Sequence, residues 1–163
     1  MKRQLLIFLF AFGMVFFSAY GHNEKMYAKQ YYPNGQLKAE GWQFMNTKTD
    51  YWIFYHPNGS VASKGHFNDN RRDGYWYFYA ESGELEREGH FIQGSSENWW
   101  IFYEIGTQNK TKFQYKNNQK NGFCLRYNKN KLIKAEKYEA DNKVGEWTSV
   151  RSFKRDNPKV SFR

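Results

Sequence analysis

Residues of the types used in metal binding are present, but their spacing forms no recognisable metal site. His66 and His90 are 24 residues apart. If they occupy equivalent positions on two strands separated by a third, their backbones lie about 9–10 Å apart. Zinc binds imidazole nitrogens at about 2.0–2.1 Å, so this pair alone is a poor metal site. We therefore expect neither a metal nor any other cofactor.

The carboxylates and hydroxyls likewise form no catalytic pattern. Glu84, Glu86 and Glu88 alternate along one segment, and paired carboxylates can carry out acid–base chemistry. However, Arg87 lies among them, which is typical of a solvated surface strip. The serine pair at 95–96 has no base at a recognisable spacing, and neither a glycine-rich phosphate loop nor a Gly-x-Ser-x-Gly motif occurs. We therefore predict a protein without enzymatic activity.

The basic residues are concentrated in the last third of the chain. The formal net charge is +9, or +7 without Lys2 and Arg3. Residues 22–109 carry eight Lys/Arg and eleven Asp/Glu, a net −3, so residues 110–163 hold +10. Within two expected hairpins the lysines are Lys110, Lys112, Lys116, Lys120, Lys129, Lys131 and Lys134. Such asymmetry predicts salt-sensitive binding of an anionic partner at residues 110–155, the alternative being a basic face that only meets solvent.

Aromatic residues and glycines follow a period of 24 residues, which identifies a repeat protein. The period is kept by Trp52, Trp76 and Trp100; by Tyr55, Tyr79, Tyr103 and Tyr127; by Gly35, Gly59 and Gly83; and by Gly41, Gly65 and Gly89. Cys124 continues the tryptophan set, and Trp147 follows it after 23 residues. Cys124 is the only cysteine, which excludes an internal disulfide. Its position favours a small buried side chain over a reactive or dimer-forming thiol.

The repeat reads as a β-hairpin. Aromatics make up 21% of the chain and suit half-buried strands, while Asn58-Gly59 and Ser82-Gly83 supply the positive φ of tight turns. Polar turns are expected at the other ends, over 46–50, 68–73 and 93–97. We therefore predict an all-β repeat protein of stacked antiparallel hairpins forming one long twisted meander sheet.

Side chains alternate between the two faces of a strand. Trp76 and Phe78 are therefore expected on one face and Tyr75 and Tyr77 on the other. The period places Trp100 on the same face as Trp76, where we expect contacts from repeat to repeat. The pattern does not decide which face is buried.

The N-terminus has the features of a secretory signal peptide. Lys2 and Arg3 precede an uncharged apolar run over 5–17, and Ala19 and Gly21 supply small residues before a cleavage point after Gly21. The run has about 13 residues, fewer than the roughly 20 needed to span a bilayer. We expect an exported protein, periplasmic, surface-located or secreted; an uncleaved membrane anchor is the alternative.

The unit resembles the MORN repeat, and more closely its bacterial variant. The matching residues are Tyr55, Gly59, Gly65, Phe67, Gly74, Trp76 and Tyr79; then Tyr79, Gly83, Gly89, Phe91, Trp100 and Tyr103, with Asn98 in place of a glycine; and, more faintly, Gly122, Cys124, Tyr127, Tyr138, Gly145 and Trp147. The resemblance spans about residues 31–150. It implies stacked hairpins that bind or scaffold. Many bacterial proteins of this group are described as YwqK-family antitoxins of toxin–antitoxin systems.

Together these features divide the chain into a signal peptide (1–21), a MORN-like hairpin domain (22–152) and a tail (153–163) that forms a final strand or a frayed end. We predict a non-enzymatic exported binding or scaffold module; an antitoxin-like protein that neutralises a cognate effector is the alternative. The expected partner is a protein, a glycan or an anionic envelope component, with peripheral membrane contact included. Export argues against nucleic acid.

Export can be tested on the protein recovered from its native cell. We expect mass spectrometry of the mature chain to show His22 as its first residue, because the charged start, the short apolar run and the small residues act together. A soluble pool that retains Met1 would contradict this prediction.

Overall fold

A computed structural model describes residues 24–160; the predicted signal peptide lies outside these residues. Eleven strands form one antiparallel sheet in the order of the sequence, and one helix follows them. The elements are β1 (Met26–Tyr31), β2 (Leu37–Phe44), β3 (Thr47–Tyr55), β4 (Val61–Asn68), β5 (Arg71–Tyr79), β6 (Leu85–Ile92), β7 (Ser95–Tyr103), β8 (Lys110–Lys116), β9 (Gln119–Asn128), β10 (Lys131–Glu139), β11 (Asn142–Trp147) and α1 (Val150–Asp156).

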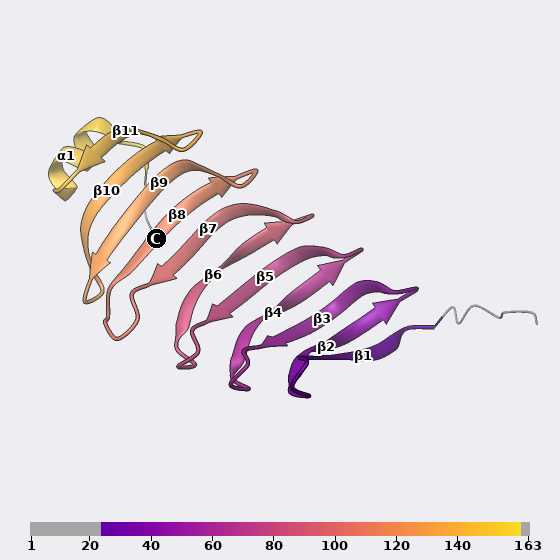
Figure 1. Ribbon diagram of the computed structural model, residues 1–163. Helices are drawn as coiled ribbons and strands as arrows, with labels where there is room; N and C mark the ends of the chain where they lie inside the picture. The colour runs from indigo at the N-terminus through magenta and orange to yellow at the C-terminus, as the bar shows by residue number, and fades with distance from the viewer. Residues whose placement is uncertain (1–23, 161–163) are drawn as a thin grey trace, which may run out of the picture.

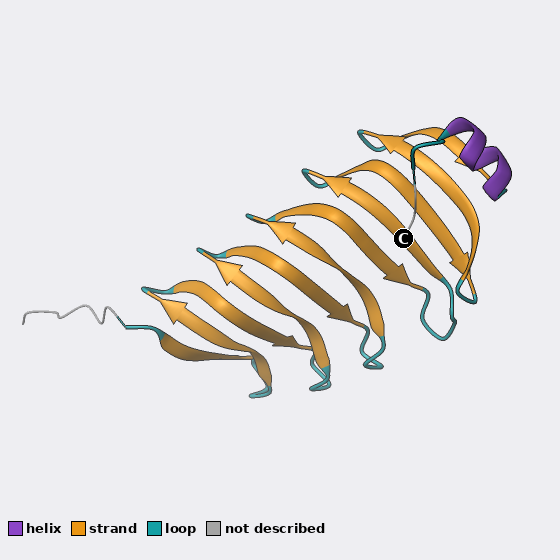
Figure 2. Cartoon of the chain, turned by 180° about the vertical axis from the view of Figure 1, so that it is seen from behind, coloured by secondary structure: helices purple, strands orange, loops and turns teal. Residues whose placement is uncertain are grey.

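The sheet is a single curved layer in which each strand pairs with its sequence neighbours (Figure 1). The predicted all-β meander of stacked hairpins is therefore confirmed. β1 and β11 form the two edges, and the hairpin turns lie in two rows along the sheet (Figures 1 and 2). This arrangement leaves most of both faces without a second layer of secondary structure.

The turns in the two rows differ in type. In one row Gly59 and Gly83 adopt φ of 85° and 86°, and this positive φ completes three-residue hairpin loops. The other row has two-residue turns in which both residues have positive φ, as at Asp69 (50°) and Asn70 (61°). Such turns match the twist of the flanking strands. The polar turns predicted over 46–50, 68–73 and 93–97 are therefore too long, because the strands resume after two residues.

A bulge explains why that prediction failed. Asp50, Gly74, Asn98 and Gly122 all have positive φ, at 54°, 75°, 59° and 117°, and they are 24 residues apart. Each lies inside a strand near a register shift, as expected of a β-bulge. Asp and Asn tolerate this conformation better than most non-glycine residues, which is why Asn98 can replace the glycine of the repeat.

Each tryptophan of the repeat lies flat over a glycine of the preceding strand. A Cβ atom added at Gly41, Gly65 or Gly89 would collide with the ring of the tryptophan eleven residues later. The ring nitrogen is satisfied as well, since Trp76 Nε1 donates to the carbonyl of His66 at 2.9 Å. Equivalent bonds run from Trp52 and Trp100 to the residues after their glycines. Glycine is thus required at these positions, because any side chain would occupy the space of the tryptophan ring.

Phenylalanines connect the tryptophans into a continuous ladder, and we name this side of the sheet the ladder face. Phe91 lies between Trp76 and Trp100, with ring centroids 6.2 and 4.9 Å away. Phe78 also contacts both rings. Trp76 is 0% exposed and Trp100 4%. The hypothesis that they share one face and connect neighbouring repeats is therefore confirmed, with phenylalanine as the link.

The ladder stops where the repeat changes. On β1 the positions equivalent to Trp52 and Phe54 are Ala28 and Gln30, and Ala28 pairs with Gly41. On β9 the equivalent positions are Cys124 and Arg126. Small or polar residues thus end the stack of rings on both sides, as expected for terminal repeats that cap an array.

The C-terminal segment departs from the predicted strand or frayed tail, because residues 150–156 form α1. The Ser149 side chain accepts a hydrogen bond from the Ser152 backbone nitrogen and caps the helix. Phe153 is buried and lies 5.4 Å from the Trp147 ring. Trp147 pairs with Ala135 on the face opposite the ladder, so it does not continue the tryptophan series.

Trp76→Ala should lower the free energy of unfolding by about 3–5 kcal/mol, because it removes a fully buried ring and exposes Gly65. Chemical denaturation measures this change. Tyr75→Ala is the matched control, since the neighbouring ring is exposed on the other face and its loss should cost under about 1 kcal/mol. Equal losses for the two variants would contradict the burial of the ladder.

Candidate binding surfaces

The face opposite the ladder carries the repeat tyrosines, and we name it the tyrosine face. Tyr55 donates a hydrogen bond to Glu40 and Tyr103 donates one to Glu88, both at 2.7 Å. Burial, together with the bond to Glu40, raises the pKa of Tyr55 to about 12. These tyrosines therefore remain neutral donors, and Glu88 is a hydrogen-bond acceptor within the sheet rather than part of a solvated acidic strip.

The charges beside these tyrosines alternate in sign along the array. Lys64 lies 5.3 Å from the Tyr79 ring centroid and Lys112 lies 5.8 Å from that of Tyr127. The register thus reads Glu40, Lys64, Glu88 and Lys112 at steps of 24 residues. The alternation of charge is present in the sequence, but only the structure shows that each of these charged residues lies beside a tyrosine of the repeat.

The N-terminal half of the tyrosine face is open and the C-terminal part is covered. Tyr27, Trp42 and Tyr51 are exposed, whereas Trp99 and Phe123 pack in the cluster that contains Phe153 of α1.

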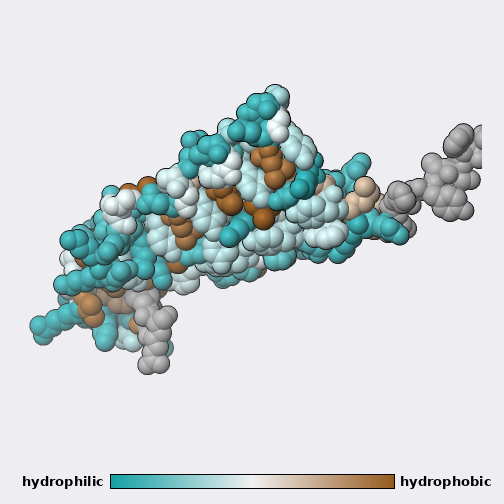
Figure 3. Space-filling model, turned by 90° about the horizontal axis from the view of Figure 1, so that it is seen from below, coloured by the Kyte–Doolittle hydropathy of each residue, from teal (hydrophilic) through white to brown (hydrophobic). Residues whose placement is uncertain are grey.

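The face seen in Figure 3 shows hydrophobic residues as separate spots among polar ones, without a broad apolar patch. The described surface on that side is therefore mixed in character.

His66 has a packing role, and both histidines of the repeat supply backbone acceptors. His66 lies 5.0 Å from the Tyr51 ring, and the carbonyl groups of His66 and His90 accept the tryptophan hydrogen bonds. Within residues 24–160 there is no group of three or more His, Cys, Asp and Glu side chains placed to hold a metal. In the same range, no helix has the length and apolarity to span a membrane.

The structure divides the predicted basic cluster between the two faces. Lys110 and Lys112 lie over the Tyr127 ring on the tyrosine face. Lys120 lies 4.6 Å from the Phe113 ring centroid on the ladder face. Of the other predicted residues, Lys116, Lys129 and Lys131 are exposed and take part in no ion pair within the described chain, whereas Lys134 is paired. The seven lysines therefore do not form one surface.

Lys134 belongs to an ion-pair network around a buried carboxylate. Glu136 is 2% exposed and lies 3.1 Å from Arg126 Nε and 3.2 Å from Lys134 Nζ. Lys143 approaches it at 3.6 Å. Burial alone would raise the pKa of Glu136, but hydrogen bonds from Cys124 and Lys134 and the charge of Arg126 outweigh it, so that this pKa is lowered.

Cys124 is the neutral partner of this network. Its thiol is fully buried, and burial together with the bond to Glu136 raises its pKa to about 12. A thiol held in its protonated form is a poor nucleophile. The interpretation of Cys124 as a small buried side chain is therefore supported over that of a reactive thiol.

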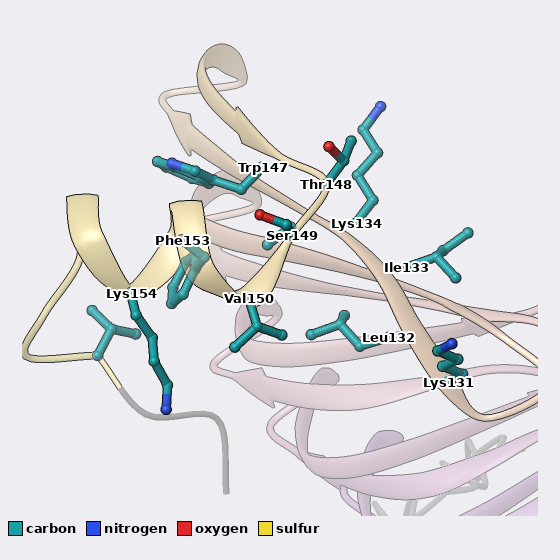
Figure 4. Close-up of a pocket in the computed structure, with 12 residues that line it drawn as sticks. Lys131, Leu132, Ile133, Lys134, Trp147, Thr148, Ser149, Val150, Phe153 and Lys154 are labelled. Atoms are coloured by element: carbon teal, nitrogen blue, oxygen red, sulfur yellow. The ribbon is translucent and has the colours of Figure 1, made fainter.

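A pocket of about 500 Å³ lies between β10 and α1. Its floor is apolar, and Figure 4 shows Leu132, Val150 and Phe153 around it. Lys131 and Lys154 stand on its two sides, from β10 and α1, whereas Lys134 extends toward its ion-pair partners. No carboxylate of the described residues lines the pocket. Sequence reasoning found Lys131 but missed the pocket, because it did not predict α1.

Comparison with known proteins identifies the repeat. The sequence model of the family described as MORN repeat variant matches residues 26–46, 51–69 and 72–93, which correspond to the regular hairpins of the N-terminal half. No curated protein matched the chain. MORN repeats indicate a binding or scaffold module.

Glu136→Gln should lower the free energy of unfolding at pH 7 by about 3 kcal/mol, since it leaves Arg126 without its anion and leaves Lys134 and Lys143 to share Glu146 alone. The folded-state pKa of Glu136 lies below the ordinary value of 4.5. Its stabilisation is therefore present above pH 4.5 and is lost as the pH falls through the folded-state value. The difference between the two proteins should shrink in that acidic range.

Denaturation at a series of pH values measures this effect. Glu139→Gln is the matched control, because Glu139 forms an exposed pair with Lys137 and such pairs contribute little. A difference between Glu136→Gln and the parent that stays constant from pH 7 to pH 3 would contradict the assignment.

Proposed function

Since the chain is a MORN-repeat protein of the variant family, we propose that it is an exported, non-enzymatic binding module whose C-terminal end engages an anionic envelope surface. The regular hairpins serve as a scaffold that holds this end in place. Export rests on the signal-like N-terminal sequence, and the partner class rests on the charge and shape of the C-terminal end.

The observation that carries the proposal is the pocket beside α1. Its lining combines apolar side chains with Lys131 and Lys154 and contains no described carboxylate. Val150 and Ile133 are exposed next to it. Lysines around an exposed apolar site are the combination that suits an anionic interface, where the charges attract and the apolar groups insert.

The charges around the pocket also favour an anionic partner. Residues 110–163 hold a net +10, a value that already counts Glu136 and Glu146. These two carboxylates pair with Arg126, Lys134 and Lys143 and not with Lys131 or Lys154. Cations near the pocket thus remain without an anionic neighbour, and attraction between such charges and a partner acts over about 8 Å at physiological salt.

The double variant Lys131→Glu/Lys154→Glu should weaken binding to vesicles containing phosphatidylglycerol by at least about 30-fold. Each lysine near an anionic surface contributes about 1 kcal/mol, so the loss of two corresponds to this factor. Sedimentation of the mature chain with vesicles measures the binding, which should also fall as salt is added.

Lys25→Glu/Lys38→Glu is the matched control, because it makes the same change of charge at the other end of the sheet. Val150→Ser tests the apolar contribution without any change of charge. If the parent does not sediment at low salt, or if the two double variants bind equally, the C-terminal surface is not the binding site. Capture of a single effector protein in place of an envelope component would favour the antitoxin-like alternative.

A further inference from the structure

A row of cations lies on the ladder face with the period of the repeat. Lys48 Nζ is 5.0 Å from the Trp52 ring centroid, the Arg72 guanidinium is 4.8 Å from that of Trp76, and Lys120 Nζ is 4.6 Å from that of Phe113. Lys48, Arg72 and Lys120 occupy one register, which is interrupted only by Ser96. The cations therefore form a line that runs across the strands.

Arg87 adds a second guanidinium beside Arg72 and departs from the repeat. The equivalent positions are Ser63 and Thr111, whereas the Arg87 guanidinium lies 4.6 Å from the Phe78 ring centroid. Arg72 approaches the same ring at 5.3 Å. Burial, and secondarily the charge of Arg87, lowers the pKa of Arg72. A departure from the repeat that places two like charges side by side is unfavourable unless a bound partner contacts them.

These charges have no anion within the described chain. None of the ion pairs of residues 24–160 includes Lys48, Arg72, Arg87 or Lys120. The carboxylates nearest in sequence to Lys48 and Arg72 are engaged elsewhere, since Asp50 pairs with Lys25 and Asp73 accepts a hydrogen bond from the Gln93 backbone. By contrast, the cations around Glu136 each pair with at least one carboxylate.

We propose that the ladder face binds a linear acidic polysaccharide, with a carboxylate or sulfate group held by Arg72 and Arg87 and further anionic groups at Lys48 and Lys120. Two guanidinium groups on one ring present several donors to the oxygens of a carboxylate or a sulfate. The site lies on the face opposite the α1 pocket and does not depend on the function proposed for it.

The spacing of the cations favours this ligand class. Lys48 and Arg72 lie on strands two apart, so their backbones are about 9–10 Å apart along the array. Lys120 lies four strands beyond Arg72, so the backbones of these two residues are about 19 Å apart. A polysaccharide that carries one acidic group on every second sugar has charges spaced on this scale. Duplex nucleic acid has one charge per about 1.7 Å of axis, which is far denser than this row.

The rings between the cations support a sugar rather than a simple polyanion. Phe54, Phe67 and Phe102 are only partly buried and pack against the ladder. They offer apolar surface to the C–H groups of sugar rings, while the cations meet the acidic substituents. An acidic peptide without apolar side chains, such as polyglutamate, would make no comparable contact with this row of rings.

Arg87→Ser is the central test, because the repeat itself places serine at the equivalent position 63 and the fold should therefore tolerate it. Calorimetric titration with hyaluronan oligosaccharides, which carry one carboxylate on every second sugar, should show binding to the mature chain. Arg87→Ser should weaken it about tenfold or more, as expected for the loss of a charge-assisted hydrogen bond. Lys48→Met should weaken it as well.

Arg71→Ser is the matched control, since Arg71 adjoins Arg72 and its side chain points to the other face; its affinity should equal that of the parent. Lys131→Glu/Lys154→Glu should also leave the polysaccharide affinity unchanged. The proposal is overturned if the parent binds no acidic polysaccharide, if Arg87→Ser and Arg71→Ser weaken binding equally, or if single-stranded DNA or polyglutamate binds as tightly.

Discussion

The packing of a tryptophan ring on the glycine of the neighbouring strand is the contact on which the sheet depends. A single layer of strands has no second sheet or helix to bury its side chains, yet Trp52 and Trp76 are fully buried. They achieve this by lying flat on the backbone, where Gly41 and Gly65 leave room for the rings. The nitrogen of each ring bonds to the adjacent carbonyl, so burial costs no hydrogen bond.

This contact also explains the chemistry of the surface. Rings that lie flat expose an upper side, and on the ladder face phenylalanines and the stems of Lys48 and Arg72 cover it. The charged groups of these side chains therefore lie over the rings at the period of the repeat. Long cationic side chains that cover apolar surface in this way contribute packing as well as charge. The core and a regularly charged surface therefore arise from the same residues.

The two ends of the array are different because each ends the ladder differently. At β1 the rings are simply replaced by Ala28 and Gln30. At β9 the tryptophan position holds Cys124, and a charged network around Glu136 replaces aromatic packing. The opposite face there is closed by α1 through Phe153. The C-terminal end thus combines a helix, a pocket and an excess of lysines that the regular repeats lack.

The 24-residue period was sufficient to predict the hairpins, the meander and the common face of Trp76 and Trp100, because strand pairing and side-chain alternation are local consequences of the pattern. The lengths of the polar turns were mispredicted, since the positive φ of Asp50 and Asn98 is not evident from residue type. The sequence placed Lys112 and Lys120 in one cluster, but they lie on opposite faces. The bulge and the register of β8 with β9 determine the face on which each side chain lies. Other features depend on residues that are brought together across strands. They are the approach of Arg72 and Arg87 to one ring, the ion pair of Lys134 with Glu136 and the pocket beside α1. Short-range sequence patterns carry no information about such contacts.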